Sequence, residues 1–105
     1  MAQFMVYANR HPASCRQFPY FVDIQSNLLR DLPTTVLIPL CDPASVAGKA
    51  IARLCPLLEI KSQSWLVMTP QLAGIERKQL GEEVQDVSAY RDVLLAAVDF
   101  ITSGI

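Results

Sequence analysis

The sequence predicts a mostly β domain in which two helices are set apart from the strands. Apolar residues make up 51% of the 105 residues and charged residues 18%, a composition that supports a packed core and is too apolar for a disordered chain. Short strand-like runs fill the chain before Ser88, and clear helical periodicity begins only there. The predicted order of strands, short helix, strands and C-terminal helix indicates an α+β fold or a small barrel.

The first predicted elements are two short strands separated by a loop. The segment 3–9, QFMVYAN, alternates side chains that are apolar on both sides, and this predicts a strand covered on both faces. Residues 10–19 follow as a turn-rich loop with Pro12 and Pro19 as breakers. The segment 20–26, YFVDIQS, has a period of two and predicts the second strand.

The middle of the chain predicts a strand and a short helix. Residues 27–35 form a polar connection that contains the apolar pair Leu28 and Leu29, and residues 36–40, VLIPL, form a strand. Pro39 cannot donate to a ladder, so we expect it at a sheet edge or a bulge. Asp42 and Pro43 suit the N-cap and first position of a helix that ends before Pro56.

The last third predicts a hairpin, further strands and the clearest helix. Residues 57–70, LLEIKSQSWLVMTP, read as two strands joined by a polar turn at 61–64, and one or two strands follow around Gly81. Ser88 is the predicted N-cap of the final helix, and Gly104 is predicted to end it in the left-handed conformation. Its apolar stripe comprises Tyr90, Val93, Leu94, Ala97, Val98 and Ile101.

Composition also excludes several classes of protein. A formal net charge of −1 lacks the basic footprint of a nucleic-acid binder. No secretory signal opens the chain and no apolar run reaches the roughly 20 residues that span a bilayer. The three scattered cysteines indicate reduced thiols in a cytoplasm rather than a disulfide framework. We therefore expect a single cytoplasmic domain over residues 1–105, without a membrane partner.

No pattern of catalytic or metal-binding residues emerges from the sequence. His11 and Cys15 lack two further ligands at the usual metal spacing, and adjacent strand carboxylates such as Glu82 and Glu83 point to opposite faces. Trp65 lies in an apolar strand and is interpreted as core or interface. A binding protein without a cofactor is therefore favoured over an enzyme.

The C-terminal stretch DFITSGI supports two interpretations. Either the last residue packs back onto the fold, or Ile105 offers an apolar side chain and a carboxylate to a cationic partner.

The ordered motifs FVDIQS, IPL, LCPLLEI, SWLVMT, GEEV and the final GI resemble the CcdB family of toxins over the whole length. The resemblance implies an SH3-like small barrel of the CcdB/Kid type with an extra small sheet, a short internal helix and a C-terminal helix. It also implies a two-fold homodimer that binds the A subunit of DNA gyrase in its dimerisation region and traps the enzyme with cleaved DNA. A CcdA-type antitoxin would neutralise it through a disordered segment, and DNA would be contacted only through the antitoxin complex.

The resemblance also implies a set of gyrase-binding residues. They are Gln3, Phe4, Tyr7, Ser26, Leu28, Leu29, Asp99, Ser103, Gly104 and Ile105. The familiar ending of the family is Trp-Gly-Ile, so Ser103 replaces an aromatic that can stack on an arginine. Phe4 and Tyr7 also suit a core, and Ser26 also suits a turn cap.

Two rival interpretations remain. Kid/MazF-type toxins share the implied fold and cut RNA, although no arrangement of acid, base and cation for that chemistry is visible. A chromosomal relative that retains antitoxin binding and has lost toxicity is the other, and Ser103 is the feature that supports it.

Overall fold

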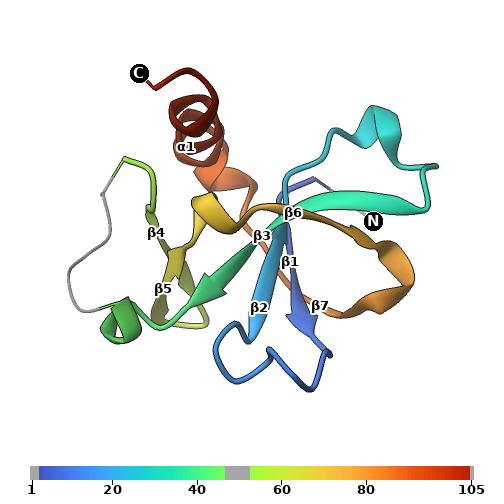
Figure 1. Ribbon diagram of the computed structural model, residues 1–105, viewed down its shortest axis with the longest axis horizontal. Helices are drawn as coiled ribbons and strands as arrows, with labels where there is room; N and C mark the ends of the chain where they lie inside the picture. The colour runs from blue at the N-terminus through green and yellow to red at the C-terminus, as the bar shows by residue number, and fades with distance from the viewer. Residues whose placement is uncertain (1–2, 47–52, 105) are drawn as a thin grey trace.

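The computed structural model describes residues 3–46 and 53–104, which form a curled, seven-stranded antiparallel sheet and one α-helix. The strands are β1 Met5–Asn9, β2 Tyr20–Asp23, β3 Thr34–Cys41, β4 Leu57–Ile60, β5 Gln63–Val67, β6 Ala73–Glu76 and β7 Leu80–Asp86, and the helix is α1 Arg91–Ser103. Figure 1 shows the strands curling into half a barrel beside α1. The predicted mostly β small barrel with a C-terminal helix is confirmed.

Strand β3 is central, and its position corrects one prediction. The order β4-β5-β3-β2-β1-β7 is completed by β6, which also pairs with β3. Pro39 therefore lies in an interior strand, in regular register opposite Phe21, rather than at an edge or bulge. On the side of β3 away from β2, pairing passes from β6, which ends at Leu37, to β5, which begins at Leu40. Between them the Pro39 carbonyl accepts from the Met68 amide at 3.0 Å, so the proline removes only the bond that its own N–H would donate.

The sheet is covered on both faces, as the strand pattern predicts. The largest cluster of buried side chains lies on the α1 side and comprises Phe4, Val6, Val22, Ile38, Leu40, Leu58, Ile60, Val67, Val87 and Leu94. Tyr7, Phe21 and Leu37, each adjacent in its strand to a member of that cluster, form a second cluster on the opposite face together with Leu80 of β7. Adjacent residues thus enter different cores, which is the consequence of the two-residue period of a strand.

The hairpin β4–β5 forms as predicted, with a turn reduced to Lys61 and Ser62. Both residues have positive φ, 51° and 69°, as a two-residue hairpin with matching twist requires. Trp65 packs edge-to-face on Tyr20 with ring centroids 5.1 Å apart, which confirms the core interpretation. Gly81 lies at the start of β7, where a Cβ would come within 2.7 Å of the Ala8 carbonyl oxygen.

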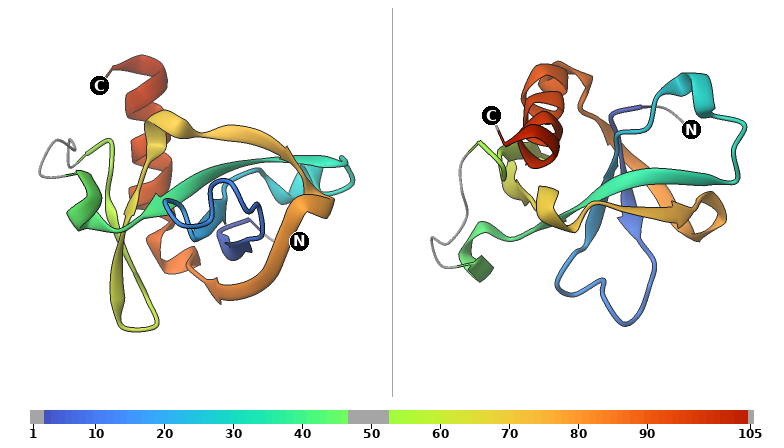
Figure 2. Two further views of the ribbon diagram at one scale, coloured as in Figure 1. Left: turned by 60° about the horizontal axis from the view of Figure 1, so that its bottom comes forward. Right: turned by 45° about the horizontal axis from the view of Figure 1, so that its top comes forward.

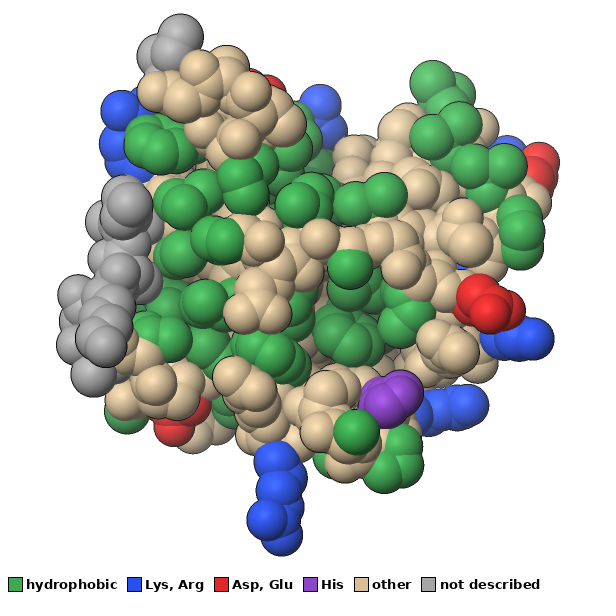
Figure 3. All heavy atoms as spheres, in the orientation of Figure 1, with side chains coloured by type: hydrophobic (Ala, Val, Ile, Leu, Met, Phe, Trp, Pro, Cys, Tyr) green, Lys and Arg blue, Asp and Glu red, His purple; other side chains and the backbone are tan. Residues whose placement is uncertain are grey.

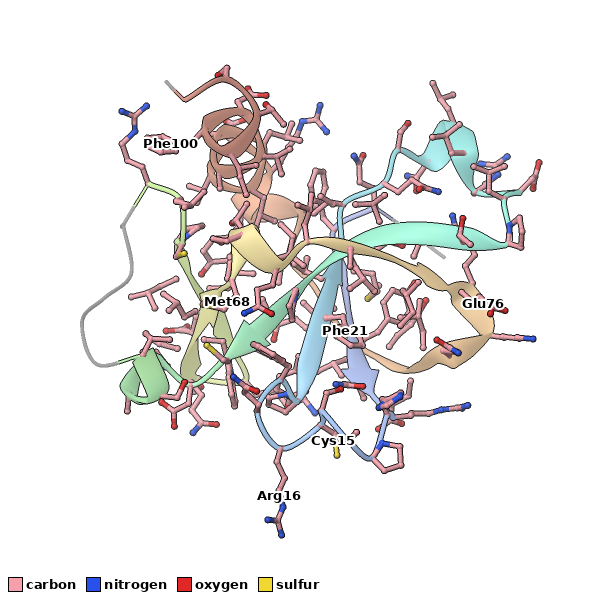
Figure 4. The ribbon with its side chains drawn as sticks, viewed as in Figure 1. Cys15, Arg16, Phe21, Met68, Glu76 and Phe100 are labelled. Atoms are coloured by element: carbon pink, nitrogen blue, oxygen red, sulfur yellow. The ribbon has the colours of Figure 1, made fainter. Side chains whose placement is uncertain are left out.

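The internal helix is observed only as its first turn. Asp42 accepts a bond from the Ala44 amide at 2.9 Å, and Pro43–Val46 form a 3₁₀ turn. The rest of the predicted helix falls largely on residues 47–52, which lie outside the described residues. The guanidinium of Arg53 lies 5.0 Å from the centre of the Phe100 ring. Phe100 is labelled beside α1 in Figure 4.

The start of α1 differs from the prediction, whereas its end agrees. Ser88 opens a 3₁₀ turn, Ser88–Tyr90, and its amide donates to Asp86 at 2.7 Å, so Ser88 is not the N-cap. The α-helical turns begin at Arg91. Gly104 ends the helix with φ 76° and donates to the Phe100 carbonyl at 2.8 Å, as a left-handed cap does.

The predicted stripe of α1 meets the sheet through Leu94 and Ala97, which are fully buried, while Val93 is exposed. The three cysteines are thiols that form no disulfide with one another, and Cys41 and Cys55 are buried. In Figure 4, Cys15 lies on the loop at the opposite end of the sheet from the tip of α1. Among the described residues, no helix combines the length and apolar character needed to cross a membrane.

Candidate functional site

The residues predicted to bind a partner separate by exposure. The exposed residues are Leu28, Leu29, Asp99, Ser103 and Gly104, the half-buried ones are Gln3 and Ser26, and the buried ones are Phe4 and Tyr7. Ile105 lies outside the described residues. The exposed residues lie in two places, on the connection between β2 and β3 and at the end of α1. Figures 1 and 2 show both places projecting from the sheet, with a gap between them.

The connection between β2 and β3 is an apolar protrusion. Residues 26–33, here called the leucine lobe, contain a single 3₁₀ turn, Asn27–Leu29. Leu28 is 93% exposed, Leu29 47% and Leu32 46%. Hydrophobic side chains gather on the lobe at the upper right of Figure 3, where a notch separates it from the end of α1. Apolar surface of this kind, without a core beneath it, is typical of a protein-binding site.

Local hydrogen bonds give the lobe its turn. The Ser26 hydroxyl oxygen accepts from the Leu28 amide at 3.1 Å and the Ser26 carbonyl accepts from the Leu29 amide at 2.9 Å. Ser26 is therefore the cap of the turn, which is the structural one of its two predicted roles. Gln3 donates its backbone amide to the Asn27 side-chain oxygen at 2.8 Å, so it ties the start of the chain to the lobe.

A polar network underlies the lobe. Gln25 donates to the Thr34 carbonyl at 3.1 Å and accepts from the Val36 amide at 3.2 Å. The buried Asp23 carboxylate accepts from the Thr35 hydroxyl at 2.8 Å and the Gln25 amide at 3.0 Å. These bonds join Asp23, the last residue of β2, and Gln25, which follows it, to the first residues of β3, across the base of the lobe.

Arg77 completes this network from a distant part of the sequence. One guanidinium nitrogen lies 3.7 Å from the Asp23 carboxylate, whose side chain is 2% exposed. Burial raises the pKa of Asp23, and the Thr35 hydroxyl, the Gln25 amide and the Arg77 charge oppose that rise. An acid and a cation thus meet here, but they lie beneath the lobe and already have partners, so the exposed surface offers apolar contact rather than an acid–base pair.

The end of α1 is built from bonds within its own turns. The Ser103 hydroxyl donates to the Asp99 carbonyl at 2.7 Å, and the Thr102 hydroxyl donates to the carbonyls of Val98 and Asp99 at 3.1 Å. Asp99, Thr102, Ser103 and Gly104 are all exposed. This tip presents small polar groups and the negative end of the helix dipole.

Phe4 and Tyr7 do not reach the surface in this structure. Phe4 is 3% exposed, and its positive φ of 66° is held by bonds from its amide to Asp23 and from the Val87 amide to its carbonyl. The Arg91 guanidinium covers its ring at 5.6 Å. Tyr7 is packed in the cluster on the opposite face of the sheet. Both residues therefore have the core role, and they support the surface rather than form it.

Among the residues of the site that were not predicted from the sequence are Asp23, Leu32 and Arg77. Leu32 had a usable signal, because it is a third leucine in the same polar connection. Arg77 had none, because it bonds to carbonyls 45 and 48 positions away.

The other side-chain clusters are weaker candidates. A cavity of about 180 Å³ is lined by Arg10, His11, Pro12, Ile75 and Gln79, which are mostly exposed. Within residues 3–46 and 53–104, no group of three or more His, Cys, Asp or Glu side chains is arranged to hold a metal ion. The leucine lobe and the end of α1 therefore remain the best supported site.

Comparison with known protein families gives a match that covers nearly all of the described residues. The model of a protein family described as CcdB protein matches residues 3–104, which is almost the entire chain.

Proposed function

This chain belongs to the CcdB family of toxin–antitoxin toxins, and from that premise we propose that it poisons DNA gyrase. In this proposal a cytoplasmic homodimer of single-domain chains binds the dimerisation region of the gyrase A subunits and holds the enzyme in its DNA-cleaved state. It performs no chemistry of its own. A CcdA-type antitoxin neutralises it by folding a disordered segment onto it, and DNA is contacted only through that complex.

The observation that carries the proposal is the exposure of the leucine lobe. Leu28 projects almost completely into solvent from a turn whose beginning is capped by Ser26 and bonded to Gln3. Exposing a leucine is unfavourable in a free protein, so a partner that covers it gains binding free energy. A partner surface with a matching apolar pocket fits this lobe.

The end of α1 supplies the polar half of the proposed surface. Asp99, Ser103 and Gly104 are exposed at the end of α1, and Ile105 follows them in the sequence. In Figure 1 the end of α1 and the lobe project from the same edge of the molecule, with a gap between them. A cationic group on the partner would offset both the Asp99 charge and the helix dipole. A partner that inserts between the lobe and the helix end would contact both places at once.

The first test is toxicity in cells with and without a resistant target. Expression should kill cells that have ordinary gyrase and spare cells that carry a toxin-resistant gyrase A subunit. Killing in both strains would contradict the proposal, and cleaved cellular RNA in such cells would favour the ribonuclease interpretation. Sedimentation of the purified protein should show a dimer at micromolar concentration.

The second test separates the lobe from the rest of the surface. Leu28→Ala should weaken binding to the gyrase A dimerisation region by about 2 kcal/mol, or roughly thirtyfold, if Leu28 is an anchor of the interface. Leu57→Ala is the matched control, because Leu57 is also an exposed leucine, 53% accessible, but lies on β4. Equal effects of the two substitutions in a calorimetric titration would contradict the assignment.

The third test concerns the end of the chain. Removing Gly104 and Ile105 should abolish toxicity and leave the fold nearly unchanged, because Gly104 is exposed and its Cβ position contacts nothing within 4 Å. Antitoxin binding should survive better, since a wrapping segment spreads its contacts. Circular dichroism of the truncated protein checks the fold, and an unfolded product would show that the end packs into the core.

A further inference from the structure

The leucine lobe is a protrusion that its own side chains do not hold in place. Its three leucines are exposed, so burial of their apolar surface contributes little to its conformation. Its internal order consists of one 3₁₀ turn of three residues, a structure that is marginal by itself. Something outside the lobe has to hold it.

Arg77 is placed at the base of the lobe by the pairing of β6 with β3. Thr34 lies opposite Glu76 in that ladder, and the Arg77 amide extends it by donating to the Pro33 carbonyl at 2.9 Å. The backbone of Arg77 is therefore joined to the last residue of the lobe before its side chain makes any contact.

The guanidinium of Arg77 then bonds to two lobe carbonyls. Its Nε donates to the Leu32 carbonyl at 2.7 Å and its Nη2 donates to the Leu29 carbonyl at 3.3 Å. Its Nη1 faces the Asp23 carboxylate at 3.7 Å, and the Arg77 side chain is only 13% exposed. A planar group with donors in fixed directions can join three acceptors in one geometry, which an ammonium group cannot do equally well.

We propose that Arg77 is the positioning residue of the leucine lobe, which holds Leu28 in the conformation that binds the protein partner. The proposal rests on the proposed function, in which that partner is the gyrase A subunit. A lobe that is ordered before binding loses less conformational entropy when it binds, so the effect of Arg77 is transmitted to affinity without direct contact. Asp23 orients Arg77, and Thr35 and Gln25 orient Asp23.

The first part of the experiment measures the lobe in the free protein. Backbone ¹⁵N order parameters of residues 28–32 should fall from about 0.85 to below about 0.6 in Arg77→Met, while those of the sheet stay unchanged. Lys78→Met is the matched control, because Lys78 is the adjacent cation, is exposed and pairs with the exposed Glu76 at 3.3 Å. Arg77→Lys should give an intermediate loss, because it retains the charge opposite Asp23 and lacks the planar fork.

The second part measures affinity for a gyrase A fragment that contains the dimerisation region. Arg77→Met should weaken binding roughly tenfold to a hundredfold, the effect expected for lost bonds to a charged group. The same substitution in a Leu28→Ala background should have a much smaller effect, because the residue that Arg77 positions is then absent.

The two measurements together decide whether Arg77 positions Leu28. Lower order parameters together with an affinity loss that depends on Leu28 support the proposal. Unchanged order parameters in Arg77→Met overturn it, and so does an affinity loss of equal size in both backgrounds. If the unaltered protein fails to bind the fragment, the proposed function is wrong, and the order parameters alone decide whether Arg77 positions the lobe. If Arg77→Met does not fold, Arg77→Lys is judged by the same criteria.

Discussion

The leucine lobe and the end of α1 are both exposed, but they are held in different ways. The lobe depends on Asp23, Gln25 and Arg77, which belong to β2, to the residues after it and to the turn after β6. The end of α1 depends on bonds between residues three or four positions apart, such as Ser103 to Asp99 and Gly104 to Phe100. One region is positioned by tertiary structure and the other by its own helix.

Because the two regions are held differently, substitutions in them should have different effects on the stability of the protein. A substitution at the end of α1 should change the local surface and leave the rest intact. A substitution beneath the lobe should alter both the stability of the protein and the presentation of its leucines.

The largest effect is expected from Asp23→Ala. This change leaves the largely covered Arg77 without its anion and removes the acceptor of the Thr35 hydroxyl, so the free energy of unfolding should fall by about 3 kcal/mol. Asp99→Ala removes the same group from the exposed helix end and should leave stability nearly unchanged. Urea denaturation of both variants makes the comparison, and similar losses would show that the contrast is false.

A smaller effect is expected from Gly104→Ala. The φ of 76° is unfavourable for a residue with a side chain, while the added Cβ would meet nothing within 4 Å. Backbone strain alone should therefore destabilise the last turn of α1 by about 1 kcal/mol. Faster amide exchange confined to residues after Phe100 would confirm this, whereas changes in the leucine lobe would show that the two regions are coupled.

Ser103→Trp should strengthen partner binding at the end of α1 without altering the leucine lobe. An exposed indole can stack on a cationic partner group, so affinity for the gyrase A fragment should rise by about 0.5–2 kcal/mol, roughly two- to thirtyfold. Ser103→Ala is the control, because it removes the hydroxyl bond to Asp99 and adds no aromatic surface. Equal affinities of the tryptophan and alanine variants would argue against a cation opposite this position.

The smallest effect concerns pH. Burial raises the pKa of Asp23 above its ordinary value, so between these two pKa values the folded state binds more protons than the unfolded state. Asp23 therefore makes its full contribution to the free energy of unfolding below its ordinary pKa. That contribution is lost as the pH rises through the raised pKa of the folded state. Relative to Asp23→Asn, the free energy of unfolding of the unaltered protein should fall across this window, and a rise would show that Arg77 outweighs burial.

Much of the fold was predictable because its signals are local. The alternation in 3–9 and 20–26, the polar turn before Gln63 and the glycine at 104 each correspond to an observed strand, hairpin or cap. Ser88 was misassigned as the N-cap because Asp86 satisfies its amide and a 3₁₀ turn intervenes before α1. Competing caps within a few residues cannot be separated by sequence pattern alone.

The sequence by itself determined which segments become strands, where α1 ends and that a pair of leucines stands in a polar connection. Only the tertiary structure decided that Pro39 lies in an interior strand, that Phe4 and Tyr7 are buried and that Arg77 lies beneath the lobe. The physical reason is the range of the interactions. Strand alternation and helix capping act over a few residues, whereas the bonds of Arg77 join positions 45 and 48 residues apart, which only the assembled sheet brings together.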